Sequence, residues 1–143
     1  MIVVTLISFS MILATALFHH HGLCWIACQY SDRGKSRFYA LPVTMFGITL
    51  LHLAEISAYA ILYFFLNTQT DLGGFTDSFV STIWNYLYFS GANYTTLGLS
   101  EFYPTGHFKV LTFTESLNGF LLITWSATFF YSMAGHFKDN IIS

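Results

Sequence analysis

Two long stretches of this sequence carry almost no formal charge, and they limit the folds open to the chain. Met1–Tyr30 contains no Asp, Glu, Lys or Arg, and its first part, Met1–Phe18, is nearly continuous in apolar residues. Phe38–Leu66 is similarly apolar, with Glu55 as its only formal charge. A helix that crosses a bilayer needs roughly 20 such residues. Each stretch therefore predicts a membrane-spanning helix.

A third apolar stretch, His107–Phe137, contains only Lys109 and Glu115 as formally charged residues. Charged residues make up 8% of the chain, whereas about 25% is usual for soluble domains. So few charges cannot cover the surface of a water-soluble globule. We therefore expect an all-α membrane protein with three transmembrane helices in a lipid bilayer. The net charge of −2 gives no reason to expect a nucleic-acid partner.

A cleaved signal peptide is the alternative interpretation of the N-terminal stretch, because Ala14-Thr15-Ala16 resembles a cleavage site. The stretch lacks a basic N-terminal segment, and its apolar character resumes at Gly22–Ala27, which favours a retained helix. Cys24 and Cys28 lie four residues apart in it, a poor spacing for a disulfide and too few thiols for a zinc site. We interpret both cysteines as small apolar side chains.

The segment Ser78–Ser100 also lacks formal charge, but its polar content distinguishes it from the three apolar stretches. Hydroxyl and amide side chains are spread through it, and Gly91 and Gly98 interrupt it. We expect residues 79–93 to form a half-helix that enters the membrane and stops, followed by irregular backbone that returns to the same surface. Such backbone is tolerated at membrane depth only where protein buries it or where it lines an aqueous path.

The basic residues predict the orientation of the chain. Residues 31–37, SDRGKSR, hold three basic residues and one acidic residue, and basic loops prefer the cytoplasm. The N-terminus, Asn67–Asp77 and Glu101–His107 are then outside, and Lys138 is inside. We therefore expect a multi-pass protein of the cell (inner) membrane with an outer N-terminus and a cytoplasmic C-terminus.

A re-entrant half-helix followed by a loop rich in Thr and Gly has the parts that cation conduction needs. A cation crosses lipid only if something replaces its water, and in potassium channels rings of backbone carbonyls from symmetric subunits do so. The C-terminal end of a helix carries partial negative charge, which favours a nearby cation. Residues 79–101 supply both features in the expected order.

The run YFSGANYTTLGLSE from Tyr88 to Glu101, followed by Pro104, resembles the pore helix, filter and outer mouth of potassium channels. The familiar pattern of that family is TTVGYGD, followed two residues later by Pro. Glu115 and Gly119 resemble the inner-helix pattern in which a glycine serves as a hinge. Close helix packing at a small residue is the alternative role for Gly119. Together with the second apolar stretch, the likeness is greatest to small bacterial two-helix pore-loop channels with one extra N-terminal helix. It implies a homotetramer that transports potassium.

The resemblance also implies roles for individual residues. The filter would present its carbonyls to the permeant cation, the Thr96 hydroxyl would face the inner cavity, and Thr95 would pack behind the filter. Four copies of Glu101 would form a ring of negative charge at the outer mouth that concentrates cations. No cofactor is implied; the permeant ion is K+, with Na+ or divalent cations as alternatives. The implied ion-contacting residues are Thr96, Leu97, Gly98, Leu99 and Ser100.

Two filter positions depart from the family pattern. Leu99 stands where the usual aromatic residue braces the filter, and leucine cannot donate a hydrogen bond. Ser100 replaces the second glycine, and a non-glycine residue in a left-handed conformation costs roughly 1–2 kcal/mol. We hypothesise that potassium permeates with reduced selectivity over sodium. A nonselective or divalent-permeable cation channel is the alternative function.

Histidines and a carboxylate lie at predicted membrane depth, where ionisable groups are costly and need partners. His52 and Glu55 share one face of the second helix, and His19–His21 lie in the cytoplasmic half of the first. We interpret His20, His52 and Glu55 as a hydrogen-bonded clasp between the helices, pH-sensitive because imidazoles titrate near pH 6.5. The alternative is a proton site, or a membrane metal-binding protein that uses His19–His21, His52 and Glu55. One Glu/His motif per chain cannot supply a dinuclear metal set, which favours the clasp.

Several kinds of protein are not indicated. There is no arginine-rich span, phosphate-binding loop or nucleophile elbow, so the sequence predicts neither a voltage sensor of the usual kind nor an enzyme with catalytic residues.

Glu115 is expected behind the filter, bonded to filter or pore-helix backbone or paired with Lys109. The predicted organisation is an extra transmembrane helix at 1–30, a cytoplasmic loop at 31–37, a pore domain at 38–137 (outer helix 38–66, pore helix 79–93, filter 95–101, inner helix 107–137) and a cytoplasmic tail at 138–143, with no soluble regulatory domain.

Overall fold

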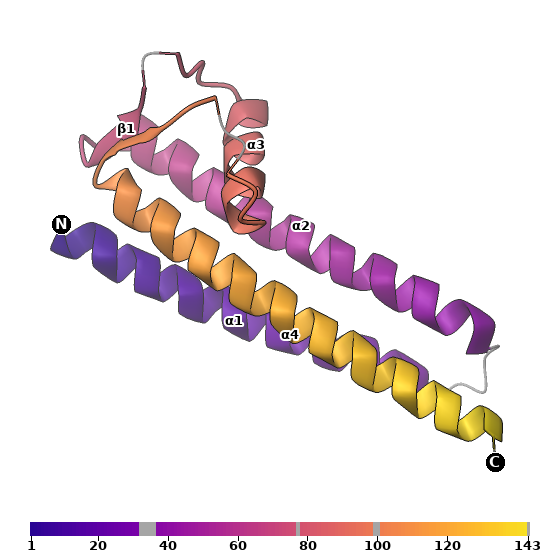
Figure 1. The fold of residues 1–143 in the computed structure, drawn as a ribbon. Coiled ribbons are helices and arrows are strands. Elements are labelled where there is room, and N and C mark those ends of the chain that lie inside the picture. Colours follow the sequence, from indigo (N-terminus) through magenta and orange to yellow (C-terminus); the bar gives the residue numbers. More distant parts are fainter. Residues whose placement is uncertain (32–36, 77, 99–100, 143) are drawn as a thin grey trace.

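Helices and a short two-stranded sheet make up the chain in the computed structural model, which describes residues 1–31, 37–76, 78–98 and 101–142. Side chains are described within these ranges except at 30–31, 37–38 and 136–142. Three of the helices are long and one is short (Figure 1). In chain order the elements are α1 Ile2–Ser31, α2 Arg37–Gln69, β1 Gly73–Phe75, α3 Ile83–Tyr94, β2 Pro104–Gly106 and α4 Phe108–Ile142.

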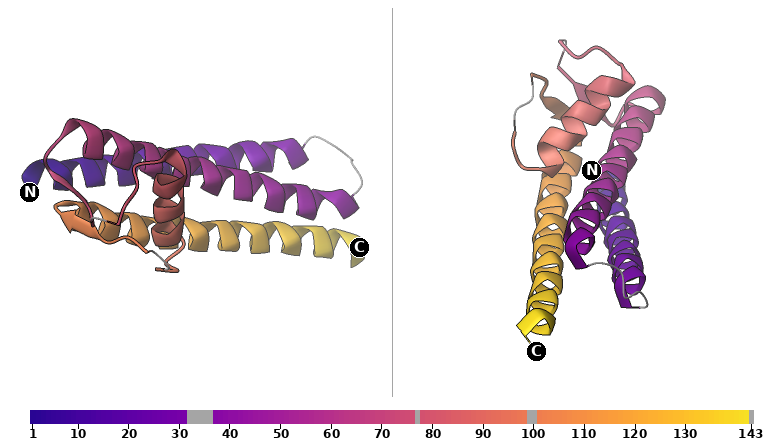
Figure 2. Two further views of the ribbon diagram at one scale, coloured as in Figure 1. Left: turned by 90° about the horizontal axis from the view of Figure 1, so that it is seen from above. Right: turned by 90° about the vertical axis from the view of Figure 1, so that its right-hand side faces the viewer.

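The three long helices lie side by side, and α1 packs against both α4 and α2. The short helix α3 lies at a large angle to them and packs against α2 and α4 (Figures 1 and 2). The N-terminus, the end of α2 and the start of α4 lie at the end of the bundle that carries the strands. The segment from β1 through α3 to β2 is therefore attached to one end of a three-helix bundle.

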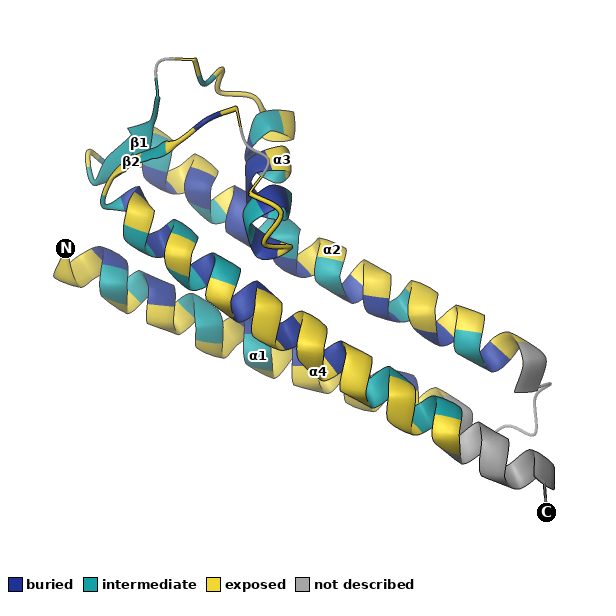
Figure 3. Cartoon of the chain, in the orientation of Figure 1, coloured by how far each residue is buried: buried dark blue, intermediate teal, exposed yellow. Residues whose placement is uncertain are grey.

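Two of the long helices have the length and composition of membrane spans. They cover Ile2–Gln29, with a mean hydropathy of 2.1, and Tyr39–Gln69, with a mean hydropathy of 1.6. Only 22% and 28% of their most apolar windows are buried inside the chain, and many of their large apolar residues are exposed (Figure 3). A core helix of a soluble protein would instead be mostly buried, so these surfaces suit contact with lipid.

α4 is not among the candidate spans found in the described part of the chain, although a third span is predicted there. It has 35 residues, which is about 52 Å of helix against a bilayer core of about 30 Å. Its polar residues Glu115, Asn118 and Ser126 lower its hydropathy, but all three are buried inside the chain. Its length permits a span, and the third span stays a prediction.

The predicted pore helix begins later than expected, at Ile83 rather than at Phe79. The reason is Thr82, which has extended backbone and whose hydroxyl accepts a hydrogen bond from the Asn85 amide at 3.4 Å. A threonine in this position caps a helix N-terminus and satisfies a free backbone donor. The helix ends at Tyr94, one residue beyond the predicted end.

The two-stranded sheet was not predicted from the sequence. β1 and β2 pair antiparallel, with Gly73 opposite Gly106 and Phe75 opposite Pro104. The pairing extends one step further, because the Thr76 amide donates to the Tyr103 carbonyl at 3.1 Å. These bonds join the chain just before α3 to the chain just after the loop that follows α3. The entire insertion therefore leaves and re-enters the bundle at one place.

Aromatic rings fix the base of this insertion to the long helices. The Phe89 ring centroid of α3 lies 5.2 Å from that of Tyr63 on α2 and 4.8 Å from that of Phe75 on β1. Phe75 in turn lies 5.5 Å from Phe108, the first residue of α4. Tyr63, Phe89 and Phe108 are almost fully buried. This cluster holds α3 rigidly between α2 and α4.

Candidate functional site

α3 runs from the strand end of the bundle toward its middle. Near its start, the Tyr86 hydroxyl accepts a hydrogen bond from the Asn67 side chain at 2.8 Å, close to the end of α2. At its last residue, the Tyr94 hydroxyl donates to Glu55. Glu55 lies about four turns, or roughly 21 Å, before the end of α2 at Gln69. The C-terminal end of α3 therefore lies near the middle of α2 and of the bundle.

The backbone stops being helical after Tyr94. The amides of Thr96 and Gly98 donate to the carbonyls of Asn93 and Ala92 at 2.9 and 3.2 Å. Thr96 and Gly98 have φ angles of 58° and 63°, in the left-handed region. Threonine is rare there because its side chain is β-branched. Strained backbone of this kind persists where the surroundings impose it and is concentrated at functional sites.

The loop after α3 is exposed in the single chain. Thr95 to Gly98 are all exposed, and Leu97 retains 66% of its accessible surface. The Thr95 hydroxyl donates to the Gly91 carbonyl of α3 at 2.6 Å. Among the remaining predicted filter residues, Leu99 and Ser100 lie outside the described residues. Glu101 is described and exposed.

Glu115 lies behind α3 with its carboxylate fully buried. One oxygen accepts a hydrogen bond from the Ser90 hydroxyl of α3 at 2.6 Å, and the other accepts one from the Tyr63 hydroxyl of α2 at 2.8 Å. Glu115 was expected to bond to filter or pore-helix backbone, or to pair with Lys109. In the described part of the chain, its partners are instead these two hydroxyl groups. The reason is register: Lys109 is exposed, whereas Glu115 faces α2 and α3. Glu115 thus joins three helices at one point.

Gly119 marks a close approach between α4 and the end of α3. A Cβ atom at Gly119 would overlap the carbonyl oxygen of Tyr94 and would lie 2.9 Å from its carbonyl carbon. α4 is helical on both sides of Gly119. Small residues allow helix backbones to approach each other closely in membranes. Gly119 has this packing role, because it has no side chain that would keep α4 away from the end of α3.

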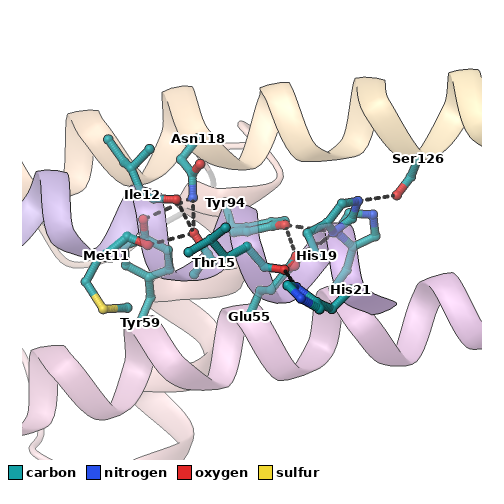
Figure 4. A network of polar contacts seen from close by, with 12 residues as sticks. Met11, Ile12, Thr15, His19, His21, Glu55, Tyr59, Tyr94, Asn118 and Ser126 are labelled. Carbon is teal, nitrogen blue, oxygen red and sulfur yellow. Dashed lines mark hydrogen bonds and ion pairs between the residues drawn. The ribbon is translucent and has the colours of Figure 1, made fainter. Parts of the chain in front are cut away.

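A second buried carboxylate, Glu55, connects α1, α2 and α3 (Figure 4). His19 Nδ1 of α1 lies 2.8 Å from one carboxylate oxygen, and His52 Nδ1 lies 3.2 Å from the other. The Tyr94 hydroxyl donates to the carboxylate oxygen that faces His52. The same hydroxyl lies 2.9 Å from His52 Nδ1. His19 and Glu55 are almost fully inaccessible. Glu55 therefore joins the extra helix α1 to the last residue of α3.

The prediction that His20 forms this clasp was wrong by one residue, since His19 occupies the position. Successive residues of a helix differ by about 100° around its axis, so the two side chains leave α1 on different sides. His20 is exposed, and its Nε2 atom lies 3.7 Å from Cys24 Sγ. Its ring stacks on Trp125, with 5.8 Å between the ring centroids. His52 and Glu55 lie where they were predicted, on one face of α2.

Two further polar contacts between α1 and α4 were missed by sequence reasoning (Figure 4). Asn118 Nδ2 of α4 donates to the hydroxyls of Thr15 and Tyr59 at 2.8 and 3.1 Å. Ser126 Oγ of α4 lies 3.0 Å from His19 Nε2. A signal was present, because Ser8, Thr15 and His19 recur at helical spacing, and all three are buried.

A short helix and its loop, held among helices of membrane length, form the arrangement expected of an ion-channel pore domain. A family profile described as "Ion channel" matches residues 1–135. The chain belongs to this family; it is a membrane ion channel and not an enzyme. Comparisons with curated proteins and with solved structures gave no match.

Proposed function

We propose that four copies of this chain surround one axis and conduct potassium through their loops at 95–101. The exposed, irregular backbone of Thr95 to Gly98 near the middle of the bundle carries this proposal. Lipid offers no hydrogen bonds, and each unsatisfied backbone group there costs several kcal/mol. The loop therefore needs either protein cover or water. Identical loops around an aqueous axis supply both.

The direction of α3 favours a cation at this place. Its C-terminal end, at Tyr94, leads directly into the loop, and this end of a helix carries partial negative charge. The helix contains no charged side chain that would oppose this field. Four such helices aimed at one axis would stabilise a cation that has lost part of its hydration shell.

Individual residues have the following roles in the proposal. The carbonyls of Thr96, Leu97 and Gly98 contact the permeant ion, together with those of Leu99 and Ser100. Four Glu101 carboxylates form the outer ring that attracts cations. For Gly119 the close approach to Tyr94 supports a packing role over a hinge.

The proposed topology has three spans, α1, α2 and α4, with residues 31–37 and the C-terminal end of α4 in the cytoplasm. α4 continues to Ile142, where a separate tail from residue 138 was predicted. The topology is supported by the position of the N-terminus, both strands and the start of α4 at one end of the bundle (Figure 1). The end of α1 and the start of α2 lie at the other end (Figure 2), and residues 31–37 carry three of the basic residues. Basic loops of this kind are retained in the cytoplasm.

The proposed selectivity follows from the residues at the outer end of the filter. Leu99 and Ser100 lack the hydrogen-bond donor ring and the glycine that brace the filter in the family pattern. We propose a preference for potassium over sodium that is weaker than that of an intact filter. A nonselective or divalent-permeable pore is the alternative, supported by the predicted Glu101 ring.

The test is potassium flux from liposomes that contain the purified protein. We expect the wild type to release potassium, and Gly98→Ala to reduce the flux at least about tenfold, because its φ of 63° disfavours any Cβ. Nothing lies within 4 Å of a Cβ at position 98, so packing is not disturbed. Gly135→Ala, which also meets nothing within 4 Å, is the control and should conduct normally. A wild type without flux, or Gly98→Ala with unchanged flux, contradicts the proposal.

A further inference from the structure

The side chains of His19, His52 and Glu55 bring three metal-binding groups from two helices to one point. One ligand atom from each residue lies within 4.8 Å of the other two. Both imidazole nitrogens that face the carboxylate are Nδ1 atoms, and each lies beside a different carboxylate oxygen, at 2.8 and 3.2 Å. The cluster is separate from the loop at 95–101 that the proposed function uses.

The spacing of these atoms suits a common metal ion. Zinc binds imidazole nitrogen and carboxylate oxygen at about 2.0–2.2 Å. In a tetrahedral site, bonds of this length place neighbouring ligand atoms about 3.3 Å apart. The observed separations of 2.8 and 3.2 Å, each to a different oxygen of Glu55, are somewhat shorter than this value, and the three ligand atoms lie within 4.8 Å of one another. Small side-chain rotations would therefore open space for an ion between the three groups.

The electrostatics of the site also favour a cation. Glu55 is buried and belongs to a helix with the length and composition of a membrane span, where an isolated carboxylate is costly. In the described part of the chain, its ion-pair partners are only these two histidines, which are charged only when protonated. A divalent cation would compensate the carboxylate while both imidazoles remain neutral.

Ser126 offers His19 the second contact that a metal-bound histidine needs. A histidine that binds metal through one nitrogen usually donates its other N–H to a nearby oxygen, which fixes the ring. His19 Nε2 lies 3.0 Å from the Ser126 hydroxyl of α4, which can accept this hydrogen bond. With Nε2 as the donor to Ser126, Nδ1 of His19, which faces Glu55 (Figure 4), would give up its proton on metal binding and offer its lone pair to the ion.

We propose that His19, His52 and Glu55 bind one divalent transition-metal ion of the zinc type in each chain. Two imidazoles and one carboxylate are the protein ligands of several zinc sites, with a fourth position left for water or another group. Binding displaces the Tyr94 hydroxyl from its hydrogen bond to Glu55. The ion thereby acts on the last residue of α3 and joins α1 to α2.

The test begins with zinc binding to the purified full-length protein in detergent. We expect one zinc per chain after removal of excess metal. His52→Ala and Glu55→Gln should each weaken binding about 100-fold or more, because each removes a ligand. Ser126→Ala should weaken it about tenfold, because it only releases the ring of His19. Tyr94→Phe should bind at least as tightly as the wild type, because it removes the competing donor.

His20→Ala is the matched control, since His20 neighbours the site on α1 but does not contact Glu55. It should bind zinc like the wild type. Full retention of zinc in both His52→Ala and Glu55→Gln, or a tenfold loss in Tyr94→Phe, overturns the assignment. So does a wild type that binds less than one zinc per chain at saturation.

Zinc X-ray absorption of the wild-type protein tests the site without any variant that could fail to fold. We expect only nitrogen and oxygen ligands at about 2.0–2.2 Å, with the outer-shell scattering of two imidazoles. Sulfur at about 2.3 Å would place the ion at Cys24 or Cys28 instead and overturn the proposal. Neither readout depends on ion conduction, so this proposal and the proposed function can fail independently.

Discussion

The carbonyl group of Tyr94, the last residue of α3, lies directly against Gly119 of α4, where any other residue would place its Cβ. This contact fixes how deeply α3 enters the bundle, because Gly119 lies about three turns, or roughly 16 Å, from the start of α4. The same residue is held on its other side by Glu55 of α2. The position of the loop at 95–98 is thus set by a glycine and by a buried carboxylate.

The first prediction concerns this contact. Gly119→Ala should destabilise the protein by about 1–3 kcal/mol, because the added methyl group overlaps the backbone of Tyr94 and forces α3 to move. Thermal unfolding in detergent, followed by helical circular dichroism, measures the change. Gly135→Ala meets no atom within 4 Å and should be neutral or stabilising by up to about 1 kcal/mol. Equal stability of the two variants would refute the packing role of Gly119.

The second prediction concerns the carboxylate behind α3. Ser90→Ala should cost about 1–3 kcal/mol of stability, because it removes one of the two hydroxyl groups that donate to buried Glu115. Ser132→Ala is the control, since Ser132 of α4 is exposed and its hydroxyl donates to the Thr128 carbonyl one turn away. It should change stability by less than about 0.5 kcal/mol. The bond to Glu115 has no structural importance if both variants melt alike.

The third prediction separates the adjacent histidines of α1. His19→Ala should destabilise the protein by about 3 kcal/mol, because it leaves a cavity and removes a partner from buried Glu55. His20→Ala should alter the melting temperature little, because His20 is exposed and does not contact Glu55. The reverse order of stabilities would restore the original assignment of His20 to the clasp.

The fourth prediction concerns the outer mouth. Glu101→Gln should reduce single-channel conductance in dilute potassium, because the proposed ring of carboxylates raises the local cation concentration. The difference should disappear in concentrated salt, where the Debye length falls to about 3 Å. Asp71→Asn, at an exposed acid in the turn after α2, serves as the control and should leave conductance nearly unchanged. A deficit that persists in concentrated salt would mean that Glu101 acts by another mechanism.

The fifth prediction concerns ion selectivity. Bi-ionic reversal potentials in planar bilayers should show that potassium is preferred over sodium, but less strictly than in channels with an intact filter. Replacement of Ser100 by Gly should increase the preference, because it restores the glycine of the family pattern, and a non-glycine residue in a left-handed conformation at that position would cost about 1–2 kcal/mol in each copy. A strict potassium preference in the wild type would contradict the hypothesis, and equal permeability would favour the nonselective alternative.

The long helices could be predicted because uninterrupted apolar stretches of sufficient length have few other stable forms in a bilayer. α2 and α4 begin within one residue of the predicted positions, at Arg37 and Phe108. The end of α3 was also within one residue, because Thr and Gly follow it. Its start was missed because the capping hydroxyl of Thr82 outweighs the apolar character of Phe79 and Val80.

Features that depend on contacts between distant residues could not be predicted from the sequence. The strands β1 and β2 have three residues each, too short for an alternating pattern, and they pair across the whole of α3. The choice between His19 and His20 depends on the rotation of α1. Apolar residues lie on all sides of that helix, so only the spacing of Ser8, Thr15 and His19 marks its buried face in the sequence. Likewise, the hydroxyl partners of Glu115 come from two other helices.

The most direct test of the pore proposal is a density map of the purified protein in lipid nanodiscs with potassium. The account predicts four copies around a central axis, with the loops at 95–101 facing it and ion density along the axis between Thr96 and Ser100. An assembly whose loops face lipid or lie away from any central axis would contradict it. So would continuous helix through Gly98.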